Sequence, residues 1–244
     1  MRLSVVVPAY NEQDRLAATL AALASQADRD FHLVIVDNQS NDATPAIART
    51  FAAGAPMPVT VLVESQHGVG AAVDTGFRFA LDNGATHLAR TDADCIPHLD
   101  WIVQIKAGFA GGGDLLCGRI VARRDENGLL MRGVFRAMVL AAGAFGRVRP
   151  RNRGRDYLTP YRMHAGNNMA ITGVTYRQCG GMPRRPSPTD REFLNRVRRV
   201  TPNIHSCPGM ISENSLRRLH VYGVRATARW YLDRGPGPHT PDPR

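Results

Sequence analysis

The fold of this chain is decided by the stretch LSVVVPAYNEQDRLAATLAALASQA, residues 3–27. Its first part, LSVVVPAY, is a short and continuous apolar run, which is typical of a strand buried on both faces of a sheet. The part that follows places Leu16, Leu20 and Leu23 at helical spacing, which predicts an amphipathic helix. A strand and a helix joined by a short connection form the repeating unit of a parallel α/β sheet.

The same unit recurs through the first hundred residues. Buried strands are predicted at 31–40, 58–65 and 86–94, and helices at 41–54, with Thr44 as its cap, and at 70–84. Such an alternation predicts a parallel sheet with helices on both faces.

The second half has a different pattern. We predict a helix near 100–114, a strand at 115–122, a mostly buried helix at 128–146, and a basic amphipathic helix at 213–233. Residues 147–166 begin with arginines at 147, 149, 151, 153 and 155 that alternate with residues such as Pro, Asn and Gly, which is not the composition of a packed element, so we expect a mobile loop there.

Composition restricts the class of protein. There are 31 Lys and Arg against 21 Asp and Glu, and the resulting net charge of +10 suits an anionic partner such as nucleic acid, anionic lipid or a phosphorylated substrate. The four cysteines are scattered and form no CxxC pair, so we expect reduced thiols and no structural zinc. We expect neither a signal peptide nor a membrane span, and hence a cytoplasmic location.

Polar residues follow the predicted strands at the point where each strand ends: Tyr10, Asn11 and Glu12; Asp37 and Asn38; Gly68 and Gly70; Asp92 and Asp94. Ligands of open α/β sheets bind beyond the carboxyl ends of the strands. Asp92 and Asp94 would point the same way on a continuing strand, which is costly unless a cation lies between them. Hard divalent cations take such oxygen ligands, so we expect a metal there, with plain turn or cap roles as the alternative.

The segments SVVVPAYNE, VIVDNQSND and TDAD, followed by GNNMAITGVTYRQCGG and PTDREFL, resemble family 2 glycosyltransferases of the GT-A fold. The resemblance implies an α/β fold in which a mostly parallel nucleotide-binding sheet, flanked by helices, merges with a smaller mixed acceptor region. It places donor binding in residues 1–122 and the acceptor and catalytic base in 123–213 of one compact domain. Residues 214–244 are then a basic C-terminal helix and tail.

Members of this family move a sugar from a nucleotide-diphosphate sugar to an acceptor hydroxyl, with inversion and usually with Mn²⁺ or Mg²⁺. By resemblance Asp94 is a direct metal ligand, and Asp92 contacts the ribose, the metal or a water on it. Donor binding is carried over to Pro8, Ala9, Tyr10, Glu12, Asp37, Gly70 and Asp92. Asp190 corresponds to the general base, with Glu192 as the alternative, and His205 is a candidate for a late metal-binding histidine or for packing.

The chain departs from the family pattern at three places. Asn38 stands where relatives often carry aspartate, which leaves a UDP-sugar and a GDP-sugar both open as donor. Asp74 ends the triplet that is often Ala-Arg-Asn, so that an arginine contact to the diphosphate would come from Arg90 or from the loop at 147–155. Thr189 replaces the glutamate that usually precedes the base.

Other functions stay open from the residues alone. A nucleotidyltransferase also uses carboxylates and a metal, although its glycine- and lysine-bearing phosphate loop is missing after the first strand. A nucleic-acid-binding protein would suit the charge, but no such motif occurs, and we expect no nucleic-acid partner. The acceptor is undetermined, with a lipid-linked one as an option. In that case the terminal helix, with Leu216, Leu219, Tyr222 and Trp230 beside Arg217, Arg218, Arg225 and Arg229, would contact the inner face of a membrane.

Overall fold

The computed structural model describes residues 1–161, 165–185, 189–217, 219–221 and 223. Its strands are β1 (Leu3–Ala9), β2 (His32–Asp37), β3 (Val59–Val63), β4 (His87–Thr91), β5 (Cys95–Pro97), β6 (Leu115–Ala122), β7 (Asn168–Thr172) and β8 (Ile204–Asn214). Its α-helices are α1 (Leu16–Ala24), α2 (Thr44–Gly54), α3 (Val69–Asp82), α4 (Trp101–Ala110), α5 (Leu129–Val148), α6 (Gly173–Gln178) and α7 (Thr189–Val200), with a 3-10 turn at Pro150–Asn152.

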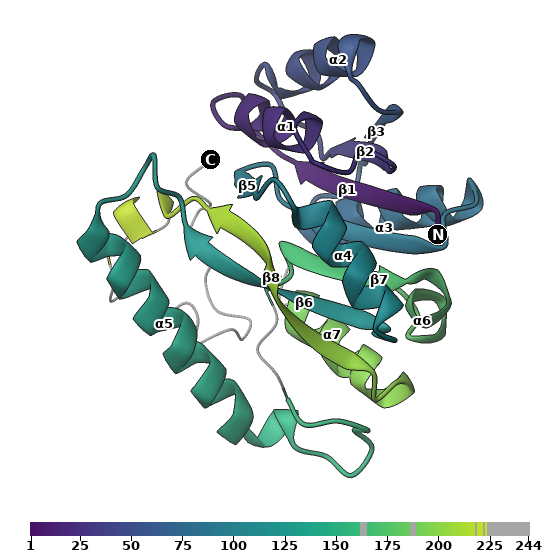
Figure 1. The fold of residues 1–244 in the computed structure, drawn as a ribbon, viewed down its shortest axis with the longest axis vertical. Coiled ribbons are helices and arrows are strands. Elements are labelled where there is room, and N and C mark those ends of the chain that lie inside the picture. Colours follow the sequence, from purple (N-terminus) through teal and green to yellow (C-terminus); the bar gives the residue numbers. More distant parts are fainter. Residues whose placement is uncertain (162–164, 186–188, 218, 222, 224–244) are drawn as a thin grey trace.

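Within the described residues the strands form one eight-stranded sheet in the order β3-β2-β1-β4-β7-β6-β8-β5 (Figure 1). Strands β1 to β4 are parallel to one another, as the strand–helix alternation predicts. Strand β7 then runs antiparallel between β4 and β6, so the second half of the sheet is mixed. The chain thus has the predicted α/β fold, in which a parallel half continues into a smaller mixed half.

Both faces of the sheet are covered, which explains the unbroken apolar run of β1. Val5 and Val7 face a core shared with α1, α2 and α4, whereas Val6 faces a second core shared with α3, α6 and α7. Successive residues of a strand point to opposite faces, so a strand buried on both sides must be apolar throughout.

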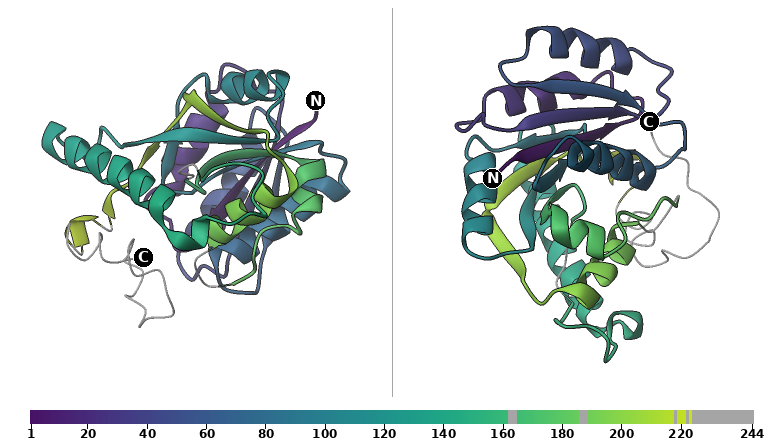
Figure 2. Two further views of the ribbon diagram at one scale, coloured as in Figure 1. Left: turned by 90° about the horizontal axis from the view of Figure 1, so that it is seen from below. Right: turned by 90° about the vertical axis from the view of Figure 1, so that its right-hand side faces the viewer.

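Helix α5 is not the mostly buried helix that its composition suggests. Gly146 is its only buried residue, and the helix lies along the outside of the molecule (Figures 1 and 2). By length and composition α5 could also cross a membrane, which sequence analysis did not expect of any segment.

The predicted helix at 213–233 is partly wrong. Glu213 and Asn214 are the last residues of β8. Leu216 and Leu219 are buried against Met131, Phe135 and Met138 of α5, so these two leucines offer no membrane-binding surface. Residues 224–244, with Arg225, Arg229 and Trp230, lie outside the described residues, as do Arg218 and Tyr222.

Candidate functional site

The polar residues predicted at the strand ends share one edge of the sheet. Ala9 at the end of β1 pairs with Asp37 at the end of β2, and Asp37 pairs with Val63 at the end of β3. Pro8 and Ala9 are buried as the last residues of β1, and Tyr10 and the residues after it continue from this edge. Tyr10 is half-buried there, with its ring edge-on to His67 at 5.6 Å between centroids.

Asp92 and Asp94 lie in a turn after β4 and not on a continuing strand. Asp92 accepts two hydrogen bonds from Arg90, Nε–Oδ1 at 2.8 Å and Nη2–Oδ2 at 3.2 Å. The third group of the same guanidinium, Nη1, donates to Oδ1 of Asp190 at 3.0 Å. Arg90 therefore brings together the turn after β4 and the start of α7, two segments about a hundred residues apart, and it is the link between two predicted site residues.

The side chain of Arg90 is buried, and this burial determines the electrostatics of the cluster. Burial opposes its charged form, but the carboxylates of Asp92 and Asp190 outweigh that effect and raise the pKa of Arg90, so that it stays protonated. Burial raises the pKa of Asp92 above its ordinary value, against the attraction of Arg90, and the nearby carboxylates of Asp94 and Asp190 add to the rise. Three of the five N–H donors of Arg90 are thus engaged by these two carboxylates.

Arg217 is a site residue that sequence analysis missed. Its guanidinium donates to both carboxylate oxygens of Glu12, with Nη1–Oε2 at 2.8 Å, and Nη2 also reaches Oδ2 of Asp94 at 3.1 Å. In the sequence, Arg217 is one of several arginines beside leucines in a predicted basic amphipathic helix, a pattern that indicates a surface helix and not a site residue. The structure instead places Arg217 as a cation between two acidic residues from separate loops.

Asp37 and Asn38 have different roles at the end of β2. Asp37 is buried, and its Oδ1 accepts from the backbone N–H of Ser40 at 3.4 Å. Asn38 holds the loop after β3: it donates to the carbonyls of Glu64 and Gln66 at 2.9 and 2.8 Å, and its Oδ1 accepts from the N–H of Gly68 at 2.8 Å. An aspartate could not make the two donations, so asparagine at 38 is explained by loop structure.

Gly68 and Gly70 lie on either side of Val69, the first residue of α3. Gly68 has φ of 125°, a backbone conformation that favours glycine, and the buried Gly70 lies in the first turn of the helix.

A second ion-pair cluster, also missed, lies behind the glycine-rich segment. Arg184 binds Glu64 at 2.8 Å and Asp74 at 3.3 Å, and the hydroxyl of Tyr176 donates to Asp74 at 2.7 Å. Hydrogen bonds from Thr75, Gln66 and Arg184 lower the pKa of Glu64 even though burial opposes this. Asp74, at the place of the family triplet, is thus a structural group that joins α3 to α6.

The GNN segment, residues 166–168, lies beside Asp190 and the buried Trp101. A Cβ at Gly166 would clash with the carboxyl group of Asp190, so any larger residue there would displace that side chain. The buried Asn168 accepts from the indole Nε1 of Trp101 at 2.8 Å and donates to the carbonyls of Arg119 and Met210 at 2.9 Å. Trp101 is therefore a core residue.

Two candidates are not brought to this cluster. His205 lies near the start of β8, opposite Leu116 at the start of the parallel strand β6, whereas the far end of β8 pairs with β5 next to Asp94. The carboxylate of Glu192 binds Arg196 at 2.7 Å on α7. Among the described residues no group of three or more His, Cys, Asp or Glu side chains is arranged as for a metal ion.

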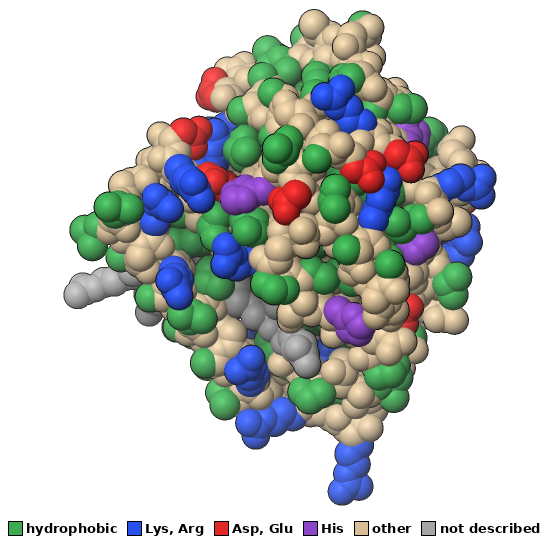
Figure 3. Space-filling model, in the orientation of Figure 1, with side chains coloured by type: hydrophobic (Ala, Val, Ile, Leu, Met, Phe, Trp, Pro, Cys, Tyr) green, Lys and Arg blue, Asp and Glu red, His purple; other side chains and the backbone are tan. Residues whose placement is uncertain are grey.

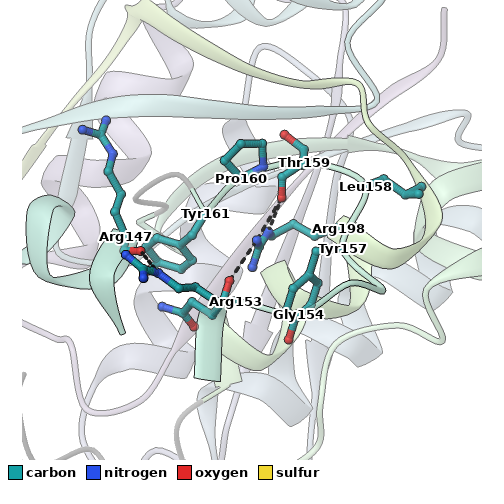
Figure 4. A pocket seen from close by; sticks show the side chains of 10 residues that line it. Arg147, Arg153, Gly154, Tyr157, Leu158, Thr159, Pro160, Tyr161 and Arg198 are labelled. Atoms are coloured by element: carbon teal, nitrogen blue, oxygen red, sulfur yellow. Dashed lines mark hydrogen bonds between the residues drawn. The ribbon is translucent and has the colours of Figure 1, made fainter. Parts of the chain in front are cut away.

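The arginine-rich segment forms a pocket of about 390 Å³ (Figure 4). Its walls are Arg147, Asn152, Arg153, Gly154, Tyr157, Leu158, Thr159, Pro160, Tyr161 and Arg198. The buried guanidinium of Arg198 lies 4.0 Å from the ring centroid of Tyr157, and its Nε and Nη2 donate to the carbonyl of Thr159 at 3.0 and 2.9 Å. Burial lowers the pKa of Arg198. Three arginines and no acidic side chain line this pocket.

Comparisons with known proteins agree with this geometry. Residues 4–211 match the model of the glycosyl transferase family 2. Glycosyltransferase AglE of Haloferax volcanii is 32% identical over 121 residues, covering 48% of this chain and 39% of AglE. The polyprenol monophosphomannose synthase of Mycolicibacterium smegmatis is 30% identical over 144 residues, covering 59% of this chain and 53% of the synthase.

Similar structures have been solved. The mannosyltransferase PcManGT from Pyrobaculum calidifontis, in complex with GDP-Man and Mn²⁺, superposes with a TM-score of 0.69 at 22% identity, covering 96% of this chain and 62% of that one. This likeness shows the GT-A fold. The match thus spans less than two thirds of each of these three proteins. Because the family model covers most of the sequence and the fold agrees with it, the chain belongs to glycosyl transferase family 2.

Proposed function

We propose that this glycosyltransferase uses a divalent cation to transfer a sugar, with inversion, from a GDP- or UDP-sugar to an acceptor hydroxyl, with Asp190 as general base. The observation that carries the proposal is the guanidinium of Arg90, which binds Asp92 after β4 and Asp190 on α7 at 2.8 to 3.2 Å. It ties the predicted donor side of the site to the predicted base.

Asp94 and Glu12 are the residues that would hold the cation. Both carboxylates bind the same positive group, the guanidinium of Arg217, so their oxygens converge on one cationic position. Carboxylate oxygens are the ligands that Mn²⁺ and Mg²⁺ prefer. A bound cation would supply charge neutralisation for the diphosphate leaving group. Arg217 would then release at least one of the two carboxylates.

Asp190 would take the proton of the acceptor hydroxyl while the new C–O bond forms and the bond from the sugar to the diphosphate breaks. Arg90 acts as a positioning residue, because its hydrogen bond fixes the direction in which the Asp190 carboxylate points. Gly166 leaves the space that this carboxylate occupies. Asp37 would accept a hydrogen bond from the edge of the uracil or guanine ring of the nucleotide-sugar, and Tyr10 would lie beside the same nucleotide-sugar.

An anionic, lipid-linked acceptor fits the rest of the molecule. The pocket lined by Arg147, Arg153 and Arg198 offers positive charge without a competing carboxylate. Arg198 lies eight residues after Asp190 on α7, about 12 Å along the helix. The name of the Mycolicibacterium relative, a polyprenol monophosphomannose synthase, points in the same direction. Family membership favours this transfer over nucleotidyl transfer or nucleic-acid binding.

The test is a thermal-shift series with GDP-mannose and UDP-N-acetylglucosamine, each with and without Mn²⁺. We expect one nucleotide-sugar to raise the Tm only when the metal is present, and Asp94→Ala to abolish the shift. Asp190→Asn should keep the shift and lose transfer. Asp82→Asn, on the exposed end of α3, serves as the control for both variants. A normal metal-dependent shift in Asp94→Ala, or turnover in Asp190→Asn, would remove the corresponding assignment.

A further inference from the structure

Helix α5 presents an unusual apolar surface to solvent. Leu129 is 82% exposed and Leu140 is 65% exposed, and Leu130, Phe145 and Val148 are exposed as well. An exposed leucine by itself needs no explanation, but a row of them along one helix marks an interaction site.

The exposed residues belong to one face of the helix. At 3.6 residues per turn, Leu129, Leu130, Gly133, Ala137, Leu140, Ala141, Ala144 and Val148 lie on the same side, and all of them are exposed. The opposite side carries Met131, Phe135 and Met138, which pack against Ala122 of β6 and against Leu216 and Leu219. The helix is therefore held to the protein by one side, while the other side has no partner within the described residues.

Positive charge lies along one border of this apolar face. Arg132 and Arg136 are four residues apart, and Arg147 follows three turns later on the same border. The α5 segment contains no acidic residue. Figure 3 shows basic and hydrophobic side chains, and no acidic ones, over the described strip of surface that α5 occupies. The net charge of the whole chain, +10, has the same sign.

These features distinguish a helix that lies on a membrane from one that spans it. A spanning helix would have to separate from Ala122 and Leu216 and carry Arg136, which lies well inside the helix, into the hydrocarbon, which is costly. A helix in the plane of the interface buries one apolar face while its arginines extend to the lipid phosphates.

We propose that α5 is a membrane-docking helix, whose exposed leucine face enters the interface of a bilayer that contains anionic lipid. The bordering arginines bind the phosphate groups. The inference goes beyond the proposed function and does not depend on it, because docking requires neither a donor nor a metal.

The test is co-sedimentation of the full chain, without nucleotide or metal, with vesicles of phosphatidylcholine containing about one third phosphatidylglycerol. We expect binding that weakens as salt is raised from about 0.1 M to 0.5 M, and much weaker binding to pure phosphatidylcholine. Leu140→Glu and Leu129→Glu should each weaken binding by about tenfold or more, because a leucine no longer leaves water and a negative charge is added. Both side chains point to solvent, so we expect both variants to keep the wild-type Tm.

Val174→Glu is the matched control, since Val174 is also 65% exposed but lies on α6, on the other side of the molecule from α5 (Figure 1). It should bind vesicles like wild type. Three outcomes would overturn the proposal: no binding of the wild-type chain to anionic vesicles, equal loss of binding in Val174→Glu, or a dimer that Leu140→Glu dissociates without any change in vesicle binding. The last result would make a second copy of the chain the occupant of this face.

Discussion

Replacing Arg90 with alanine removes a buried side chain that joins the turn after β4 to α7. The buried guanidinium makes three hydrogen bonds to two carboxylates, at 2.8, 3.2 and 3.0 Å. Removing one partner of a buried ion pair costs about 3–5 kcal/mol, because the remaining charge is left without its partner.

For Arg90→Ala we expect a loss of stability somewhat below this range of about 3–5 kcal/mol, because both carboxylates are partly exposed. The side chains of Asp92 and Asp190 are 27% and 31% exposed, so water regains part of their solvation once the arginine is gone. The alanine also leaves a cavity, which adds to the cost. We therefore expect Arg90→Ala to lower the free energy of unfolding by about 2–4 kcal/mol.

Urea unfolding followed by circular dichroism measures this loss directly. Asp190→Asn is the control, because its amide oxygen can still accept the hydrogen bond from Arg90, so it should lose about 1 kcal/mol or less. Arg90→Lys keeps the charge but not the fork that reaches both carboxylates, and should lie between wild type and alanine. A loss below about 1 kcal/mol in Arg90→Ala would refute the view that this arginine holds the two segments together.

Three further variants test other parts of the structure. The pKa of Glu64 is lowered from 4.5, so its contribution to stability is complete above that value and is lost as the pH falls through the lowered pKa. In Glu64→Gln the Tm should therefore fall less steeply at acidic pH than in the wild type. An unchanged fall of the Tm with pH would contradict this. Asn168→Ala leaves a buried indole N–H and two carbonyls without their partner, and should cost about 3–5 kcal/mol in urea unfolding, while a cost under about 1 would show that water replaces the amide. Gly166→Ala should reduce the transfer rate more than tenfold, because its methyl group displaces the Asp190 carboxyl, while the affinity for the nucleotide-sugar stays near normal. Gly133→Ala on α5, where the added methyl meets open space, is the control and should leave the transfer rate unchanged.

Local patterns were enough to predict the parallel half of the sheet and the edge at which the candidate site residues lie. The apolar run of β1 requires burial on both faces, and the structure shows this for Val5, Val6 and Val7. The rule that parallel strands end at one edge predicted that Asp37 and Asp92 lie at the same edge of the sheet. The proposed role of Asp190 came from the family resemblance alone, because no local pattern connects α7 to β4.

Composition was misleading where burial depends on what lies beside an element. The α5 segment has the residues of a core helix, yet its outer face has no partner within the described residues, because Leu216 and Leu219 cover only its inner side. Arg217 lies between these two leucines, and the sequence had suggested that it contacts a membrane surface. In the structure its guanidinium binds Glu12 and Asp94 instead. Helical spacing says which residues share a face, but not what that face meets.

The sequence by itself determined the α/β class, the first four strands with the helices between them, and the acidic residues at the ends of those strands, because each depends on the local pattern of residues along the chain. Only the tertiary structure decided that Arg90 joins Asp92 to Asp190, that Arg217 lies between Glu12 and Asp94, and that Arg184 joins Glu64 to Asp74. These ion pairs link residues up to about two hundred positions apart. A charged side chain in a sequence carries no record of its partner, and the partner is known only once packing has brought the two together.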